Sequence, residues 1–123
     1  MLKNKKILLA TSNKGKIREF KKIFHDFKLI SQEELDIDDA VEDGLTFFEN
    51  ALKKARHASK HSDLFSIADD SGLVVPDLNY EPGIYSARYA GIGSTDEENR
   101  NKIISQLKNR NEIELSAYYV CEI

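Results

Sequence analysis

Apolar residues in this chain fall into two patterns: short unbroken runs, and stripes with a spacing of three or four residues. Unbroken runs of this length are typical of buried strands, and the stripes are typical of amphipathic helices. The predicted strands are residues 6–10, 64–68, 73–75 and 114–123. The predicted helices begin near residues 14, 46 and 95. This order of strands and helices predicts a layered α/β fold.

Residues that cap helices support these starts. Ser12 or Asn13 can cap the first helix, whose apolar stripe extends over residues 17–27. Capping-box pairs occur at Thr46–Glu49, Ser94–Glu97 and Thr95–Glu98. Residues 31–44 are acidic and weakly periodic, and residues 77–94 are rich in turn formers, so we predict mostly loop for both. A loop as long as the second one is often functional.

Length, charge and cysteine content narrow the class of protein. A chain of 123 residues predicts one domain, residues 1–123. The net charge of -3 argues against general nucleic-acid binding. Cys121 is the single cysteine, so no intrachain disulfide can form, and a reducing compartment fits. Since no apolar run approaches the roughly 18 residues of a membrane span, we expect a cytoplasmic protein with neither membrane nor nucleic acid as a partner.

The segment TSNKGK, residues 11–16, lies between the first predicted strand and the first predicted helix. Backbone N–H groups at a helix N-terminus bind anions, and Gly15 permits close approach of a ligand. Hydrogen-bond donors or positive charges come from Thr11, Ser12, Asn13, Lys14 and Lys16. Cations are unfavourable at this end of a helix, where the dipole is already positive. A bound phosphate would cancel that repulsion.

Two interpretations of this segment compete. Lys16 falls on the inward stripe of the helix and Lys14 falls outside it. For either lysine alone, a solvated side chain on a capped helix is the simpler interpretation. For all six residues at a strand–turn–helix junction, we favour phosphate binding. The segment is not a Walker A loop, because the G-x-x-x-x-G-K-[ST] spacing is absent.

The motif ADDSG, residues 68–72, follows a predicted buried strand. Successive side chains of a strand point to opposite faces, so Asp69 and Asp70 are expected to serve different partners. A carboxylate at a strand end suits Mg²⁺, which binds one or two carboxylates together with substrate phosphates. A turn in which an Asp caps backbone amides explains the motif equally well.

Two further residues are weak candidates when each is considered alone. Glu42 could be a second metal ligand, but nothing distinguishes it from any other loop acid. Lys54 lies on a border of the stripe of the second helix and could reach a phosphate, although a lysine whose stem covers the core is the commoner case. His57 and His61 have metal-binding spacing without an H-E-x-x-H motif, and we interpret them as surface histidines.

Together the residues predict an α/β domain that binds a phosphate ester or a nucleotide and hydrolyses it with the help of a metal ion. No local pattern indicates a Ser-His-Asp or Cys-His nucleophile. These residue types do not identify the base of the nucleotide.

Four motifs in order resemble the inosine/xanthosine triphosphate pyrophosphatase family. They are LLATSNKGKIREF, EDGLTFFENALKKA, IADDSGLVV and PGIYSARYAG. The resemblance implies a mixed central sheet flanked by helices, in two lobes with a cleft, and commonly a homodimer. It also implies Mg²⁺-dependent hydrolysis of deaminated purine nucleotides such as ITP, dITP and XTP. The products are the monophosphate and pyrophosphate, and the reaction cleans the nucleotide pool.

The same resemblance assigns roles to matching positions. The implied substrate-binding residues are Thr11, Ser12, Asn13, Lys14, Gly15, Lys16, Lys54 and Ser71. Glu42 and Asp70 match metal ligands, and Asp70 also matches the general base that activates a water for attack on the α-phosphorus. The resemblance thus raises Glu42 and Lys54 from weak candidates to expected site residues.

The chain also departs from the family. Family members are longer, and the motifs that hold the purine base do not occur in these 123 residues. We therefore expect an ITPase-like domain that is incomplete at its C-terminal end. A fragment, a shortened enzyme with relaxed base specificity, or a chain that a partner completes would each explain this. The alternative function is a nucleotide-binding subunit, or an inactive fragment, that lacks the base pocket.

Overall fold

The computed structural model describes residues 5–108, 110 and 114–123. The chain divides into two compact units, residues 1–69 with Ile123 and residues 70–122. Each unit is described by itself. The single domain over residues 1–123 stays a prediction.

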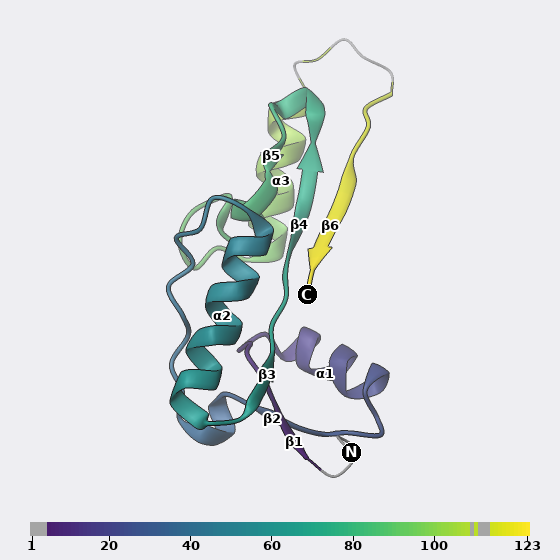
Figure 1. Cartoon of the computed structure of the whole chain (residues 1–123). Helices are drawn as coiled ribbons and strands as arrows, with labels where there is room; N and C mark the ends of the chain where they lie inside the picture. Colours follow the sequence, from purple (N-terminus) through teal and green to yellow (C-terminus); the bar gives the residue numbers. More distant parts are fainter. Residues whose placement is uncertain (1–4, 109, 111–113) are drawn as a thin grey trace. The chain divides into compact units, whose positions relative to one another are not determined.

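The first unit contains a parallel sheet with the strand order β2-β1-β3 (Figure 1). Its strands are β1 (Lys6–Leu9), β2 (Lys28–Ser31) and β3 (Phe65–Ile67). Its helices are α1 (Lys14–Ile23), α2 (Phe47–Ser62) and the short 3-10 helix η2 (Glu33–Leu35). Leu8 lies opposite Ile30 in one pair of strands and opposite Ser66 in the other. Because the strands are parallel, the segments that follow β1 and β3 leave the sheet at the same edge.

Small side chains let α2 pack closely on this sheet. The buried cluster consists of Leu8, Ala10, Ala58 and Ala68. Partly buried Ile37, Ala55 and Leu64 pack against it. The Ser66 hydroxyl donates a hydrogen bond of 2.6 Å to the carbonyl oxygen of Ala55, which joins β3 to α2 directly. The core of this unit therefore lies between α2 and β1 with β3.

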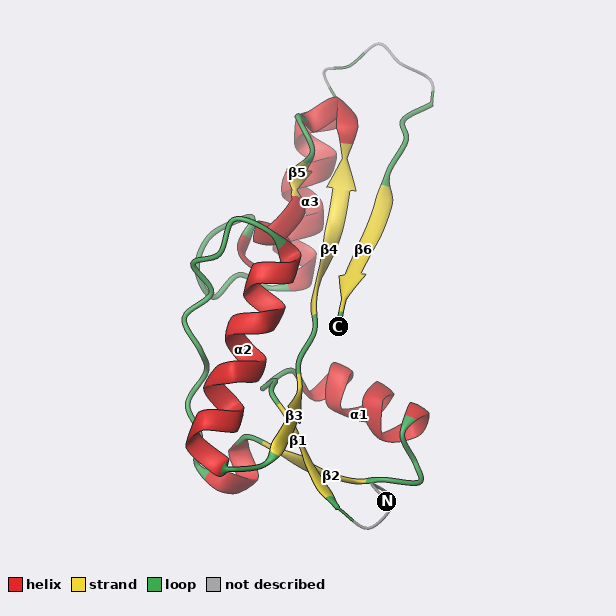
Figure 2. Ribbon diagram, viewed as in Figure 1, coloured by secondary structure: helices red, strands yellow, loops and turns green. Residues whose placement is uncertain are grey.

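The second unit contains an antiparallel sheet with the strand order β5-β4-β6 (Figure 2). Its strands are β4 (Asp70–Val75), β5 (Glu81–Pro82) and β6 (Tyr118–Glu122). Its helical segments are the 3-10 helices η3 (Pro76–Leu78) and η4 (Gly83–Arg88) and the α-helix α3 (Asp96–Leu107). Ser86 attaches η4 to β4, because its hydroxyl oxygen accepts a 2.9 Å hydrogen bond from the Leu73 N–H.

The predicted α/β class is confirmed, with parallel pairs in one sheet and antiparallel pairs in the other. The predicted start of α2 is confirmed, because the Thr46 hydroxyl accepts a hydrogen bond from the Glu49 N–H. The Glu49 carboxylate accepts from the Leu45 N–H and not from the Thr46 N–H, so the capping box is incomplete. Of the two pairs predicted for α3, Thr95–Glu98 forms a complete capping box.

The structure differs from the predictions made from the sequence at three places. The stripe expected to continue to Phe27 stops with α1 at Ile23, whose side chain is 69% exposed. Residues 28–30, for which no element was predicted, form β2 together with Ser31, the first residue of the predicted loop 31–44. A four-residue edge strand has no recognisable period of its own, and its pairing with the distant β1 is what makes it a strand. The predicted loop 77–94 contains η3, β5 and η4.

A helix that crosses a membrane has to be both long and apolar. Within the part of the chain that the structure describes, no helix meets both conditions.

Candidate functional site

The loop between β1 and α1 is held by its own side chains. Of the two predicted caps, Ser12 and Asn13, it is Asn13 that caps α1. Its Oδ1 accepts a 3.1 Å hydrogen bond from the Lys16 N–H. The Thr11 hydroxyl oxygen accepts a 3.1 Å bond from the Asn13 N–H. A Cβ on Gly15 would lie 3.1 Å from Asn13 Oδ1, closer than ordinary packing allows. A side chain at position 15 would therefore crowd the oxygen that caps the helix.

Lys16 points inward and meets a carboxylate of the chain. Its Nζ lies 2.9 Å from Asp69 Oδ2, and the two side chains are 25% and 4% exposed. The other oxygen, Asp69 Oδ1, is buried and has no hydrogen-bond partner among the described residues. Lys14 is exposed. The helical wheel thus separated the two lysines correctly, and Asp69 is the anion that faces Lys16 in this structure.

Glu42 and Lys54, predicted separately, form an ion pair. Lys54 Nζ lies 2.9 Å from Glu42 Oε1, and the lysine is the more buried of the two. The pair joins the loop before α2 to the second turn of that helix. Lys54 is predicted to bind phosphate, and Glu42 is predicted to bind a metal ion. If a metal–triphosphate binds in this way, Lys54 and Glu42 would have to give up their contact with each other.

Asn50 fixes the loop that carries Glu42. Its side chain is 1% exposed, and its Oδ1 accepts a 2.8 Å hydrogen bond from the Gly44 N–H. A Cβ on Gly44 would lie 2.6 Å from that oxygen, so the loop can approach α2 only at glycine. In the same loop, the hydrogen bond and charge of Lys53 lower the pKa of Asp43. Asn50 was seen in the sequence only as a residue on the border of the helix stripe.

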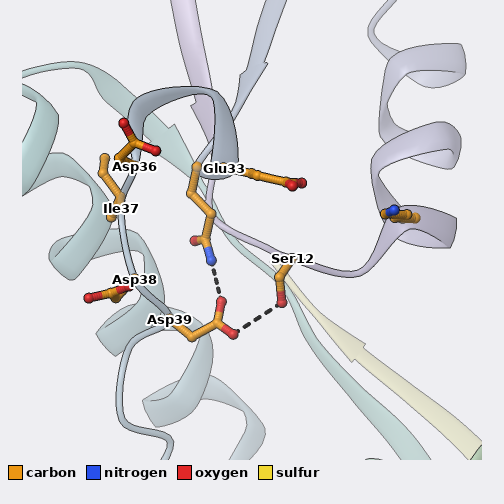
Figure 3. A pocket seen from close by; sticks show the side chains of 8 residues that line it. Ser12, Glu33, Asp36, Ile37, Asp38 and Asp39 are labelled. Atoms are coloured by element: carbon orange, nitrogen blue, oxygen red, sulfur yellow. Dashed lines mark hydrogen bonds between the residues drawn. The ribbon is translucent and has the colours of Figure 1, made fainter.

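An open pocket of about 500 Å³ lies beside Ser12 (Figure 3). It is lined by Ser12, Lys14, Gln32, Glu33, Asp36, Ile37, Asp38 and Asp39. The Ser12 hydroxyl donates a 3.1 Å hydrogen bond to Asp39 Oδ2, and the Gln32 side-chain amide donates to Asp39 Oδ1. Sequence reasoning missed Asp39, because nothing local links it to Ser12, 27 residues earlier.

The two remaining candidates belong to the second unit. Asp70 is the first residue of β4 and is 8% exposed. Ser71 follows it, and the Ser71 hydroxyl oxygen accepts a 3.3 Å hydrogen bond from the Tyr119 hydroxyl on β6. In the strand register, Asp70 lies opposite Glu122 and Ser71 lies opposite Cys121. Eight predicted site residues therefore belong to the first unit, and these two belong to the second.

The donor set suits Mg²⁺ in its chemistry. Over the described ranges, no group of three or more His, Cys, Asp or Glu residues is arranged to hold a metal ion. Mg²⁺ does not need such a group when one or two carboxylates act together with phosphate oxygens. Glu42 in the first unit and Asp70 in the second each carry a carboxylate of this kind, and Asp69 Oδ1 in the first unit is a buried oxygen without a hydrogen-bond partner among the described residues.

Comparisons with known proteins extend over almost the whole chain. The model of the Ham1 family matches residues 7–123. A protein of Legionella pneumophila (strain Lens) named dITP/XTP pyrophosphatase is 51% identical over 119 residues, 97% of this chain and 61% of the relative. A stretch of that length leaves out at most four of the 123 residues, so it includes every candidate from Thr11 to Ser71.

Solved structures agree with these matches. A HAM1 protein from Coxiella burnetii superposes with a TM-score of 0.84 at 42% identity, over 94% of this chain and 60% of that one. The Ham1 protein of Staphylococcus aureus gives a TM-score of 0.75 at 40% identity, over 95% of this chain and 69% of that one. The predicted family resemblance is confirmed. The chain spans about 61% of the length of the curated relative from Legionella.

Proposed function

Because the chain belongs to the Ham1 family, we propose that it is a hydrolase that converts the deaminated purine nucleotides ITP, dITP and XTP to the monophosphate and pyrophosphate. The observation that carries this proposal is the 51% identity to a protein named dITP/XTP pyrophosphatase, which extends over all candidate residues. The reaction would remove damaged nucleotides from the pool.

The first unit supplies the groups that bind the triphosphate. The loop residues Thr11–Lys16 lie at the N-terminus of α1, where backbone N–H groups and the helix dipole favour an anion. Lys16 and Lys54 add positive charge, and both already face an anionic group, Asp69 and Glu42. Binding of the substrate transfers these lysines, wholly or in part, from carboxylates of the chain to phosphate oxygens.

Glu42 and Asp70 are the residues that would hold Mg²⁺. When bound, the ion supplies neutralisation of the charge that develops on the phosphates. Mg²⁺ is a hard cation and prefers carboxylate oxygens to the ring nitrogens of a histidine such as the exposed His61.

Asp70 is the proposed general base. It removes a proton from a water molecule as the water oxygen forms a bond to the α-phosphorus. The bond from the α-phosphorus to the bridging oxygen breaks, and pyrophosphate leaves toward Lys16 and Lys54. Burial of Asp70 limits competition from bulk water for its carboxylate. Ser71, next in the strand, would contact the substrate.

We further propose that the protein works as a homodimer in the cytoplasm. Cys121 is exposed and is the single cysteine, so no intrachain disulfide can form, which suits a reducing compartment. Sedimentation of the purified protein at micromolar concentration would measure the oligomeric state directly.

The deciding experiment measures pyrophosphate release from dITP, ITP, XTP, GTP and ATP with MgCl₂. We expect release from the first three and a fall of at least about 100-fold in Asp70→Asn, the usual effect of losing a general base. Asp63→Asn is the matched control, because Asp63 is exposed and has a left-handed backbone that asparagine tolerates.

Two results would contradict the proposal. Equal rates for Asp70→Asn and the parent would remove Asp70 from the chemistry. Binding of dITP by the folded protein without any release would favour the alternative, a nucleotide-binding subunit without turnover.

A further inference from the structure

We propose that Asp39 is an internal competitor of the substrate, which weakens triphosphate binding by taking the hydroxyl hydrogen of Ser12. The inference rests on the proposed function, since it assumes that the loop Thr11–Lys16 binds phosphates. It assigns a role in affinity to a residue that neither the motifs nor the family resemblance selected.

The contact is held in place from the opposite side. Asp39 itself is exposed, but its Oδ1 accepts from the side-chain amide of Gln32, which is only 5% exposed. This anchored amide orients the carboxylate so that Oδ2 lies 3.1 Å from the Ser12 hydroxyl oxygen (Figure 3). The pairing of Ser12 with Asp39 is therefore part of a three-residue chain and does not depend on one mobile side chain.

A serine hydroxyl has one hydrogen to donate. While that hydrogen is donated to Asp39, Ser12 can present only lone pairs to a ligand. Phosphate oxygens are acceptors as well, so Ser12 cannot bind one in this state. Substrate must break the bond to Asp39 before Ser12 becomes a phosphate donor.

Charge acts in the same direction as the hydrogen bond. The pocket beside Ser12 contains four carboxylates, those of Glu33, Asp36, Asp38 and Asp39, against the one ammonium group of Lys14. Of the four, Asp39 is the one that accepts from Ser12. A triphosphate near Ser12 is repelled by the whole set, but it competes for a hydrogen atom only with Asp39.

The substitution Asp39→Asn separates these effects, because it changes polarity at nearly constant shape. The asparagine oxygen can keep the bond from Gln32. Its amide nitrogen then faces Ser12 and donates to the hydroxyl oxygen, which frees the hydroxyl hydrogen for a phosphate. Asp38→Asn is the matched control, since it removes the same charge from the same pocket one residue away.

The test is calorimetric titration of the purified protein with inorganic tripolyphosphate in the presence of MgCl₂. We expect Asp39→Asn to lower Kd about 3- to 10-fold, which is the factor that one hydrogen bond represents. Asp38→Asn should lower it less than about twofold, as expected for an exposed charge. In a Ser12→Ala background, Asp39→Asn should have no larger effect than Asp38→Asn has. Asp39→Ala removes the acceptor outright and must change Kd in the same direction as Asp39→Asn.

Three outcomes overturn the inference. Equal effects of Asp39→Asn and Asp38→Asn would show a charge effect without competition. Weaker binding by Asp39→Asn would show that Asp39 orients Ser12 productively. Absence of tripolyphosphate binding by every variant would leave Asp39 with nothing to compete against.

Failure of the inference and failure of the proposed function give different results. Turnover of dITP together with an unchanged Kd in Asp39→Asn overturns the inference alone. Tighter tripolyphosphate binding in Asp39→Asn without dITP turnover supports the inference and overturns the enzymatic proposal.

Discussion

The two units hold their candidate residues by different means. In the first unit, three candidates lie on a loop or a helix, and each contacts a carboxylate of the chain. The pairs are Ser12–Asp39, Lys16–Asp69 and Lys54–Glu42. In the second unit, Asp70 and Ser71 begin a strand, and their positions follow from the register of β4 against β6.

The two units therefore differ in what holds their candidate side chains in place when no ligand is bound. In the first unit, Lys16 and Lys54 each face a carboxylate of the chain, and under the proposed function those carboxylates would compete with the substrate. Residues on a strand take their positions from backbone pairing. If the first unit binds a triphosphate as proposed, these side chains would exchange partners on binding, and mutation of the carboxylates would change the affinity.

The units also differ in the direction of their pKa shifts. In the first, the N–H and then the hydroxyl of Ser31 lower the pKa of Glu34, so the stability that Glu34 contributes is lost as the pH falls through its folded-state pKa. In the second, burial and then the bond to Glu81 raise the pKa of Tyr89. Acid thus removes the stabilisation that Glu34 contributes, and alkali removes the stabilisation that Tyr89 contributes.

Gly44→Ala should have the largest effect on stability, because it disturbs the loop that carries Glu42 in the first unit. The new Cβ would lie 2.6 Å from Asn50 Oδ1 and 2.9 Å from Glu49 Cβ, so the loop or the start of α2 must move. We expect a loss of about 2–3 kcal/mol in the free energy of unfolding, measured by urea titration, as for other overpacked sites. Gly15→Ala should cost less, because its nearest contact is 3.1 Å. Equal stability of Gly44→Ala and the parent would contradict the close packing of this loop.

Asp69→Asn should have a smaller effect and tests the need for a counter-charge. It leaves Lys16, which is partly buried, without its carboxylate partner. We expect the free energy of unfolding to fall by about 1–2 kcal/mol. This is less than the cost of breaking a fully buried ion pair, because Lys16 keeps some contact with water. Asp43→Asn removes the carboxylate of the exposed pair with Lys53 and should leave the Tm close to that of the parent. Similar Tm values for Asp69→Asn and Asp43→Asn would show that the Lys16–Asp69 ion pair stabilises the fold no more than an exposed ion pair does.

Tyr89→Phe should have the smallest effect on stability, and it tests a side-chain hydrogen bond of the second unit. The buried Tyr89 hydroxyl contacts Glu81 Oε2 at 3.1 Å and Gln106 Oε1 at 2.5 Å, so its loss should cost about 1 kcal/mol near neutral pH. Because the folded-state pKa of Tyr89 lies above its ordinary value of 10.0, the unfolded chain loses this proton first. The stabilisation is complete below pH 10.0 and is lost as the pH rises through the folded-state pKa.

Thermal unfolding from pH 9 to pH 11 (about one unit either side of the ordinary tyrosine pKa) measures this slope. The parent should lose more Tm over this range than Tyr89→Phe does. Tyr80→Phe is the control, since Tyr80 is exposed. A slope that persists unchanged in Tyr89→Phe would assign the alkaline sensitivity to another group.

Features set by neighbours along the chain could be predicted from the sequence. Asn13 as a cap, the Thr46 hydroxyl on the Glu49 N–H and the Thr95–Glu98 box all join residues three positions apart. The inward position of Lys16 followed from helical spacing alone. The α/β class followed from the order of strands and helices.

Features set by distant contacts could not be predicted. The strand β2 exists because Lys28–Ser31 pairs with β1, and its four residues carry no periodic pattern. The Ser12–Asp39 bond and the Lys16–Asp69 pair join segments that meet only when the parallel sheet has formed. The family resemblance selected Glu42 and Lys54 one by one, and the structure shows them paired.

Capping residues and helical spacing were enough to predict where the helices begin, which lysine of the first loop turns inward and the α/β class, and four motifs were enough to predict the family. The groups that neutralise the candidate cations, and the hydrogen bond from Ser12 to Asp39, are visible only in the folded chain. The physical reason is range: capping and periodicity act over three or four residues. Ion pairs and hydrogen bonds between loops depend on a sheet that brings distant residues to one edge.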